Sequence, residues 1–150
     1  MAVLVTTNIN GDTVEFACDP HESLLDVLRN RLSDDGVALL HTIGRADGPG
    51  ATNPWIAKYI FPGGCLPCPR EFRREAQAAG LTVIDEFNFG ADYAETLRRW
   101  RDAFLAAKAQ VLQLGFDERF IRTWEFYLAY CEAAFDEANI DVVQYTLQKA

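Results

Sequence analysis

The stretch that decides the fold lies in two blocks: residues 39–44 read Leu-Leu-His-Thr-Ile-Gly, and residues 53–64 read Asn-Pro-Trp-Ile-Ala-Lys-Tyr-Ile-Phe-Pro-Gly-Gly. The apolar run at 37–40 predicts a strand that is covered on both faces. Asn53 is a favourable N-cap and Pro54 fits the first position of a helix, so a short helix is predicted directly after the loop. A buried strand followed by a helix indicates the α/β fold class.

More motifs follow along the rest of the chain: Asn88–Tyr93, Thr96–Trp100, Gly115–Phe120 and Trp124–Glu132. Together with the first two blocks they resemble the second half of cyclopropane-fatty-acyl-phospholipid synthases and mycolic acid methyltransferases, over residues 36–150. The resemblance implies a class I methyltransferase that uses S-adenosylmethionine. Full-length members of the family add a methylene group to unsaturated phospholipid acyl chains, so these acyl chains are the implied partner.

The predicted fold is a partial Rossmann-like methyltransferase. By resemblance, strands at 37–40, 81–84 and 140–147 are the last three of a seven-stranded sheet, and the final strand lies antiparallel between its two predecessors. Two long helices, one ending at Gly115 and one beginning at Asp117, are predicted from their apolar stripes. We expect a mixed sheet of about five strands, with an N-terminal β-hairpin at its otherwise open edge.

The N-terminal segment carries a different signature. Alternation in residues 2–18 around Asn10-Gly11 predicts the β-hairpin, and Ser23 predicts the capped start of a short helix. Residues 1–32 resemble the start of a xanthine dehydrogenase-type two-iron, two-sulfur ferredoxin-like subunit. The cysteine group that binds the cluster in that family does not follow, so no iron–sulfur cluster is expected.

The two resemblances divide one predicted domain, residues 1–150, into three parts. A ferredoxin-like hairpin and helix occupy 1–32, a seam lies at 33–36, and the methyltransferase part occupies 37–150. A single core suits a chain of this length. A natural fusion, a misassembled gene and a constructed chimera would each produce such a seam, and the sequence leaves all three open.

The net charge bears on the class of partner. The 22 acidic and 14 basic side chains give a net charge of −8, which disfavours nucleic acid and gives no general attraction to an anionic membrane. No apolar run approaches the roughly 20 residues of a transmembrane helix, and the N-terminus lacks a secretory signal. A cytoplasmic chain is expected, with any membrane contact peripheral and at the inner surface.

His41, Ile43 and Tyr93 are the candidate catalytic residues. His41 lies at the predicted C-terminal end of its strand, where open α/β sheets place ligands. By resemblance, the His41 imidazole, the Ile43 main-chain N–H and the Tyr93 phenol hold a bicarbonate ion that serves as a base. The alternative is structural: the histidine satisfies a neighbouring backbone group and the tyrosine packs in a helix stripe. The carboxylate and cysteine that complete this ion site in the family have no identified counterpart.

Trp55, Tyr59 and Phe61 are the candidate substrate-binding residues. By resemblance they line an acyl-chain channel, and the alternative is ordinary packing of a short helix on the sheet. The stripes of the two C-terminal helices are interpreted as core rather than as a ligand surface. They comprise Tyr93, Leu97, Trp100, Phe104 and Val111 on the first helix, and Phe120, Trp124, Tyr127, Cys131 and Phe135 on the second.

S-adenosylmethionine is the cofactor that the resemblance implies, but the sequence does not reveal its binding residues. No G-x-G-x-x-G-like pattern follows a strand before residue 36, Gly11 belongs to the predicted hairpin turn, and the glycines of residues 47–50 follow the wrong strand. Binding by a single copy is therefore expected to be poor or absent. A homodimer, or a separate partner that supplies an N-terminal half, is left open.

Cys65 and Cys68 form a C-x-x-C pattern before a predicted helix, where a thiolate gains stability from the helix dipole. In the resembling family this segment is a turn with a serine at the position of Cys68. We therefore rank turn structure above redox chemistry, and redox chemistry above metal binding. No metal site is assigned, because zinc would need two further ligands with paired spacing.

Three functional hypotheses follow. The first is a partial S-adenosylmethionine-dependent methyltransferase of the cyclopropane synthase type that is inactive alone. The second is a noncatalytic fused or constructed scaffold module, which failure to bind S-adenosylmethionine would favour. The third is a small iron–sulfur or thiol redox protein, which visible absorbance would reveal.

Overall fold

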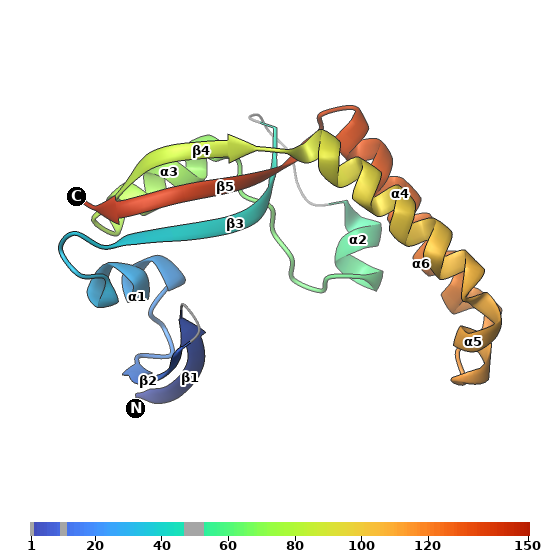
Figure 1. Ribbon diagram of the computed structural model, residues 1–150, viewed down its shortest axis with the longest axis horizontal. Coiled ribbons are helices and arrows are strands. Elements are labelled where there is room, and N and C mark those ends of the chain that lie inside the picture. Colours follow the sequence, from blue (N-terminus) through green and yellow to red (C-terminus); the bar gives the residue numbers. More distant parts are fainter. Residues whose placement is uncertain (1, 10–11, 47–52) are drawn as a thin grey trace.

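The computed structural model describes residues 2–9, 12–46 and 53–150, and within them five strands form two sheets (Figure 1). β1 (Val3–Ile9) and β2 (Asp12–Cys18) pair antiparallel, from Val3 with Cys18 to Ile9 with Asp12. This register confirms the predicted hairpin, although its turn at Asn10-Gly11 lies outside the described residues.

The second sheet carries the main core. It comprises β3 (Val37–Arg45), β4 (Leu81–Asn88) and β5 (Ile140–Lys149), in the order β3-β5-β4. β5 is antiparallel to both neighbours, and a register shift between Val83 and Asp85 interrupts its pairing with β4. The predicted antiparallel insertion of the last strand between its two predecessors is confirmed.

The hairpin does not extend this sheet, so its predicted place at the edge of β3 is wrong. α1 (Leu24–Arg31) lies between the hairpin and the sheet (Figure 1). The hairpin is attached to this helix through Arg31, whose guanidinium donates to the carbonyl of Ala17 at 2.9 Å and lies 4.9 Å from the ring centre of Phe16. The apolar side chains of α1 cover the core, and the hairpin stays outside it.

One face of the three-stranded sheet is covered by α3 (Pro69–Ala78) and α1. The Phe72 ring of α3 stacks on Tyr145 of β5 with centroids 4.0 Å apart. Leu25 and Leu28 of α1 pack against the same cluster. A bidentate ion pair between Arg73 of α3 and Glu86 of β4 also links this helix to the sheet.

The opposite face of β3 is exposed, contrary to the predicted cover on both faces. Exposure alternates along the strand, and the side chains of Val37 and Leu39 keep 59% and 65% of their surface accessible. The physical reason is that α1 and α3 pack on the same side of the sheet. β3 also continues to Arg45, so His41 lies in the middle of the strand and not at its end.

Three helices project from the sheet as a second body (Figure 1). α4 (Gly90–Ala106) and α6 (Glu118–Asp136) pack against each other, and α5 (Lys108–Gln113) lies at their far end. The predicted single first helix is therefore divided at Ala107. Trp100, predicted in the buried stripe of that helix, is 52% exposed.

Ion pairs hold α4 and α6 together beside their apolar contacts. Arg98 of α4 donates to Glu132 of α6 at 3.0 Å and to Asp136 at 3.3 Å, and it also pairs with Glu95 on its own helix. Arg101 lies 2.6 Å from the second carboxylate oxygen of Glu132, outside hydrogen-bond geometry. Two guanidinium groups thus face one largely buried carboxylate.

The predicted helix starts are confirmed. Ser23 and Asp26 form a reciprocal capping box on α1, and the Asn53 side chain accepts from the Trp55 N–H at the start of α2 (Pro54–Tyr59). Asp117 accepts from the Phe120 N–H at 2.8 Å and caps α6. Among the described residues, no helix is long and apolar enough to cross a membrane.

Candidate functional site

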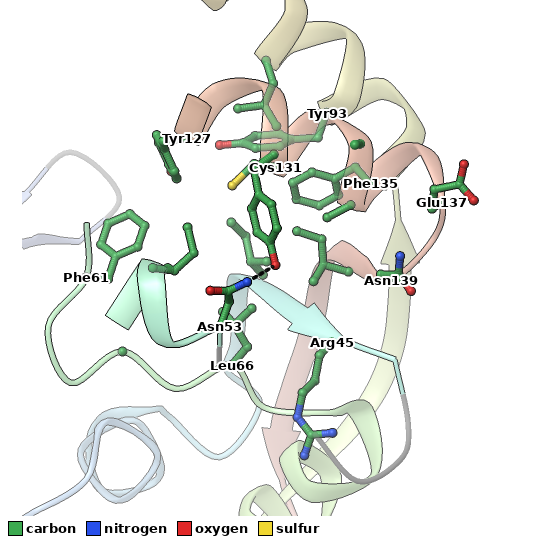
Figure 2. Close-up of a pocket in the computed structure, with 18 of the residues that line it drawn as sticks. Arg45, Asn53, Phe61, Leu66, Tyr93, Tyr127, Cys131, Phe135, Glu137 and Asn139 are labelled. Carbon is green, nitrogen blue, oxygen red and sulfur yellow. Dashed lines mark hydrogen bonds between the residues drawn. The ribbon is translucent and has the colours of Figure 1, made fainter. Parts of the chain in front are cut away.

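A pocket of about 770 Å³ lies where the helical body meets the end of β3 and the short helix α2 (Figure 2). Its size falls within the range of small-molecule sites. Its wall is predominantly apolar or aromatic and includes Ile43, Phe61, Tyr93, Leu97, Tyr127 and Phe135.

The spacing of residues along α4 and α6 places several side chains of the pocket wall on one face of each helix. Tyr93 and Leu97 are four residues apart on α4, and Tyr127, Cys131 and Phe135 are spaced by four on α6, so each set lies on one helix face. The two faces meet because α4 packs on α6, with Tyr93 and Phe135 edge to face at 5.1 Å. α2 and the segment after it supply the remaining side through Phe61, whose ring lies 5.9 Å from Tyr127.

Few of the side chains in the wall are charged or carry an amide: Arg45, Asn53, Glu137 and Asn139. The Asn53 side-chain amide donates to the Tyr130 phenol oxygen at 3.0 Å, drawn as the dashed line in Figure 2. Arg45, at the end of β3, forms an ion pair with Glu71 of α3 at 3.2 Å. A largely apolar wall with a few polar groups suits a ligand with a long apolar part.

The interior disfavours negative charge. Burial raises the pKa of the Tyr127 phenol to about 12, assisted by the neighbouring Cys131 and Tyr93. Burial also raises the pKa of the Cys131 thiol to about 11, and a hydrogen bond with Tyr127 acts in the opposite direction. Both groups are therefore neutral at physiological pH, and Cys131 is a poor nucleophile there.

The structure brings together two of the three predicted catalytic residues. Ile43 and Tyr93 both line the pocket. His41 is exposed and is not part of the pocket wall; its ring lies edge to face with Phe89 at 5.3 Å. The Phe89 carbonyl accepts from the backbone N–H of Tyr93 at 3.1 Å, and neither Phe89 nor His41 is part of the pocket wall.

Of the predicted substrate-binding residues, Phe61 lines the pocket and Trp55 and Tyr59 do not. Trp55 packs edge to face on Phe126 of α6 at 4.7 Å, and Tyr59 lies beside Trp55. Lys58 lies 5.1 Å from the ring centre of Tyr59. Trp55 therefore packs α2 against α6, and Tyr59 packs on Trp55 within α2.

The C-x-x-C pair is divided between two environments. Cys68 is buried at the N-cap of α3, and its backbone N–H donates to Glu71 at 3.4 Å. Hydrogen bonds from Cys68 lower the pKa of the Glu71 carboxyl. Cys65 is exposed and lies at the pocket wall, and the two cysteines are not bonded to each other. This arrangement agrees with the turn interpretation.

Sequence reasoning missed several residues of the wall. Tyr127, Cys131 and Phe135 were interpreted as core, yet they line the pocket. Asn53 was expected only to cap α2, but it also reaches Tyr130. The available signal was the four-residue spacing of Tyr127, Cys131 and Phe135, which does not distinguish a core from a cavity wall.

The described residues do not fit S-adenosylmethionine. A dinucleotide-type site needs a glycine-rich turn between a strand and a helix, with the helix N-terminus free to face the ligand. The β4–α4 connection does carry Gly90, but the carboxylate of Asp141 already accepts from its N–H at 2.7 Å. In the part of the chain that the structure describes, no three His, Cys, Asp or Glu side chains lie together in a way that could hold a metal ion.

Solved structures identify the fold as that of a methyltransferase. The cyclopropane synthase MmaA2 from Mycobacterium tuberculosis aligns with a TM-score of 0.76 and 29% identity, over 83% of this chain and 48% of that one. The mycolic acid cyclopropane synthase CmaA1 complexed with SAH and CTAB aligns with a TM-score of 0.74 and 31% identity, over the same shares.

The chain belongs to the mycolic acid cyclopropane synthetase family, whose sequence pattern it matches over residues 11–145. It is 38% identical to the cyclopropane-fatty-acyl-phospholipid synthase of Escherichia coli K12 over 124 residues, which are 83% of this chain and 32% of the relative. It is 47% identical to the tuberculostearic acid methyltransferase UfaA1 of Mycobacterium tuberculosis over 97 residues, 64% of this chain and 23% of the relative.

The matches cover only part of each relative. The chain spans between about a quarter and about half the length of the relatives it matches. The family match starts at residue 11 and so covers most of the segment that was compared with ferredoxin-like subunits. The comparisons give that second resemblance no support.

Proposed function

We propose that this chain is the acyl-chain-binding part of an S-adenosylmethionine-dependent methyltransferase that modifies unsaturated acyl chains of phospholipids. The observation that carries the proposal is the pocket of about 770 Å³ between α2, α4 and α6, walled by apolar and aromatic side chains. An alkyl chain gains about 0.8 kcal/mol for each methylene it buries in such a wall.

The similarity to CmaA1 supports the same ligand class. That protein was solved with SAH and with CTAB, an amphiphile whose long alkyl chain resembles that of a lipid. The neutral Tyr127 and Cys131 in the pocket fit an uncharged chain, and Arg45, which pairs with Glu71, supplies a cation in the wall at the end of β3. An acyl chain along the apolar wall, with its polar head group near Arg45, suits this distribution.

The proposal also assigns His41, Ile43 and Tyr93 to a base site that holds a small oxyanion such as bicarbonate. Ile43 and Tyr93 share the pocket wall, and His41 lies two residues from Ile43 on the same strand. The imidazole, backbone N–H and phenol are all donors to an oxyanion. The donors for S-adenosylmethionine are not among the described residues, so catalysis requires them from elsewhere.

The test is binding of the fluorescent fatty acid cis-parinaric acid, with oleate and octanoate as competitors. We expect saturable binding that oleate reverses and octanoate does not. Phe61→Ala should weaken binding about tenfold, as the loss of an aromatic contact predicts. Phe116→Ala is the matched control, because this ring is also exposed but lies beyond the far end of α5. Absence of saturable binding, or equal loss in both variants, would reject the acyl pocket.

A second measurement separates ligand binding from the reaction. Oleate binding without S-adenosylmethionine binding in calorimetry is the expected result for this chain. Saturable S-adenosylmethionine binding would show that the chain rebuilds a cofactor pocket, and methylene transfer to vesicles of unsaturated phospholipid would then be measured directly. His41→Ala should abolish that transfer and leave oleate binding unchanged.

A further inference from the structure

Phe89, which lies between β4 and α4, connects the two outer strands of the three-stranded sheet. Its backbone N–H donates to the carbonyl of Val142 on β5 at 3.0 Å, so the chain is still tied to β5 after β4 has ended. Its ring lies edge to face with the imidazole of His41 on β3, with centroids 5.3 Å apart and planes at 77°. One side chain thus reaches across the central strand of the sheet.

The strand register explains why the two rings meet. His41 and Ile43 are two residues apart and so share one face of β3. Val142, the partner of Ile43 on β5, lies on the same face, and its carbonyl holds Phe89 on the opposite side of β5. The rings of Phe89 and His41 therefore approach each other from the two sides of β5, over one face of the sheet.

Phe87 supports the Phe89 ring. The two rings stack with centroids 5.6 Å apart and an angle of 22° between their planes. Phe87 pairs with Gln144 of β5, which also pairs with His41, so β5 separates Phe87 from His41. The Phe89 ring is partly buried and contacts an aromatic ring from each outer strand. These two contacts restrict its rotation, so it presents a defined surface to the imidazole.

The backbone of Phe89 also fixes the start of the helix that carries Tyr93. The Phe89 carbonyl accepts from the Tyr93 N–H at 3.1 Å, in the first turn of α4. The next residue, Gly90, donates its N–H to the carboxylate of Asp141 at 2.7 Å. Phe89 therefore contacts two of the three residues assigned to the base site: His41 through its ring and Tyr93 through its carbonyl.

We propose that Phe89 is a positioning residue of the base site, whose ring orients the His41 imidazole toward the oxyanion. The inference rests on the proposed function, which makes His41 and Tyr93 donors to a small oxyanion such as bicarbonate. An exposed imidazole rotates about two side-chain bonds, whereas a donor to a bound ion must keep one direction. An edge-to-face aromatic contact restricts this rotation without a hydrogen bond to the imidazole.

The NMR signals of the His41 ring protons test the contact in the intact chain. The chain has two histidines, so His21 is an internal reference and a His21→Gln variant assigns the signals. Phe89→Leu keeps the backbone hydrogen bonds but removes the aromatic ring current, and should move the His41 signals toward those of a histidine in a short peptide. Phe89→Tyr should leave them in place. Phe87→Leu is the matched control, because it removes an exposed ring from the same face and should move them much less.

Titration with sodium bicarbonate at constant pH and ionic strength tests the role. The His41 signals of the native chain should move saturably. Phe89→Leu should raise the apparent Kd by up to about tenfold, as the loss of one aromatic contact predicts, and Phe89→Tyr should restore the native Kd. A purely structural contact would instead lower the thermal stability of Phe89→Leu and leave the Kd unchanged.

The outcomes separate this inference from the proposed function. An unchanged bicarbonate Kd in folded Phe89→Leu, or His41 signals that ignore the substitution, would overturn the positioning role and leave the base site standing. A native chain whose His41 signals do not respond to bicarbonate would reject the base site itself, and the role of Phe89 with it. Thermal unfolding of each variant establishes that it is folded.

Discussion

The side-chain amide of Asn53 donates a 3.0 Å hydrogen bond to the phenol oxygen of Tyr130, which joins the start of α2 to α6 at the pocket wall. Asn53 has a second task, because its side-chain oxygen accepts from the Trp55 N–H at 2.9 Å and caps α2. One residue thus fixes both the helix and its position against α6.

Asn53→Ala should lower the free energy of unfolding by about 1–2 kcal/mol, since it removes a cap and a tether together. Tyr130→Phe removes only the acceptor of the tether and should cost about 0.5 kcal/mol at this exposed position. Urea unfolding of both variants separates the contribution of the helix cap from that of the hydrogen bond to Tyr130. An equal loss in the two variants would contradict the double role.

Gly90 is required by the carboxylate beside it. A Cβ at this position would lie 2.5 Å from Asp141 Oδ1 and 3.3 Å from its Cα. Gly90→Ala should therefore displace β5 or break the 2.7 Å bond from the Gly90 N–H, at a cost of about 1–3 kcal/mol. Thermal unfolding gives the size of this loss.

The double variant Gly90→Ala with Asp141→Ala supplies the control. Removing the carboxylate makes room for the new methyl group, so the combined loss should be smaller than the sum of the two single losses. Strict additivity would show that the cost at residue 90 comes from the helix backbone and not from the contact with Asp141.

The helix starts could be predicted from the sequence because a helix cap depends on only a few neighbouring residues. Ser23, Asn53 and Asp117 cap the three helices predicted from them, and Gly80, with a φ of 77°, follows the helix that Pro69 begins. The order of the last three strands came from the family resemblance. Periodicity alone would not have placed β5 in the middle.

The position of His41 and the pocket depend on tertiary packing. The apolar run at 37–40 ends before His41, but β3 continues because its partner β5 pairs as far as Arg45. Tyr127 and Cys131 have the spacing of core residues, and they line a cavity because the segment after α2 approaches α6 and places Phe61 beside Tyr127. Neither the length of a pairing nor the approach of a distant helix is encoded in a local pattern.

Glu132 should matter more for stability than the other acids of the network between α4 and α6. Its carboxylate is only 12% exposed and faces both Arg98 and Arg101. Glu132→Gln keeps the shape but removes the charge, and should lower the free energy of unfolding by about 1–2 kcal/mol. Glu95→Gln removes an exposed partner of Arg98 and should cause a smaller loss that disappears in high salt. A larger effect at Glu95 would reverse this ranking.

Stability should decrease at alkaline pH because of the buried thiol and phenol in the pocket. Folding raises the pKa of Cys131 from 9.0 to about 11 and that of Tyr127 from 10.0 to about 12. The unfolded chain therefore releases these protons at lower pH than the folded chain does. The stabilisation is fully present below pH 9.0 and is lost progressively as the pH rises toward the folded values.

Urea unfolding at a series of pH values tests this sign and assigns it to residues. Cys131→Ala should make the decrease in unfolding free energy less steep between pH 9 and 10, and Tyr127→Phe should act mainly above pH 10. Leu128→Ala, a buried neighbour on α6 that does not titrate, should lower stability at every pH and leave the slope unchanged. If Cys131→Ala keeps the original slope, the thiol is as easily ionised in the folded chain as in the unfolded one, and the interior of the pocket is more hydrated than its apolar wall implies.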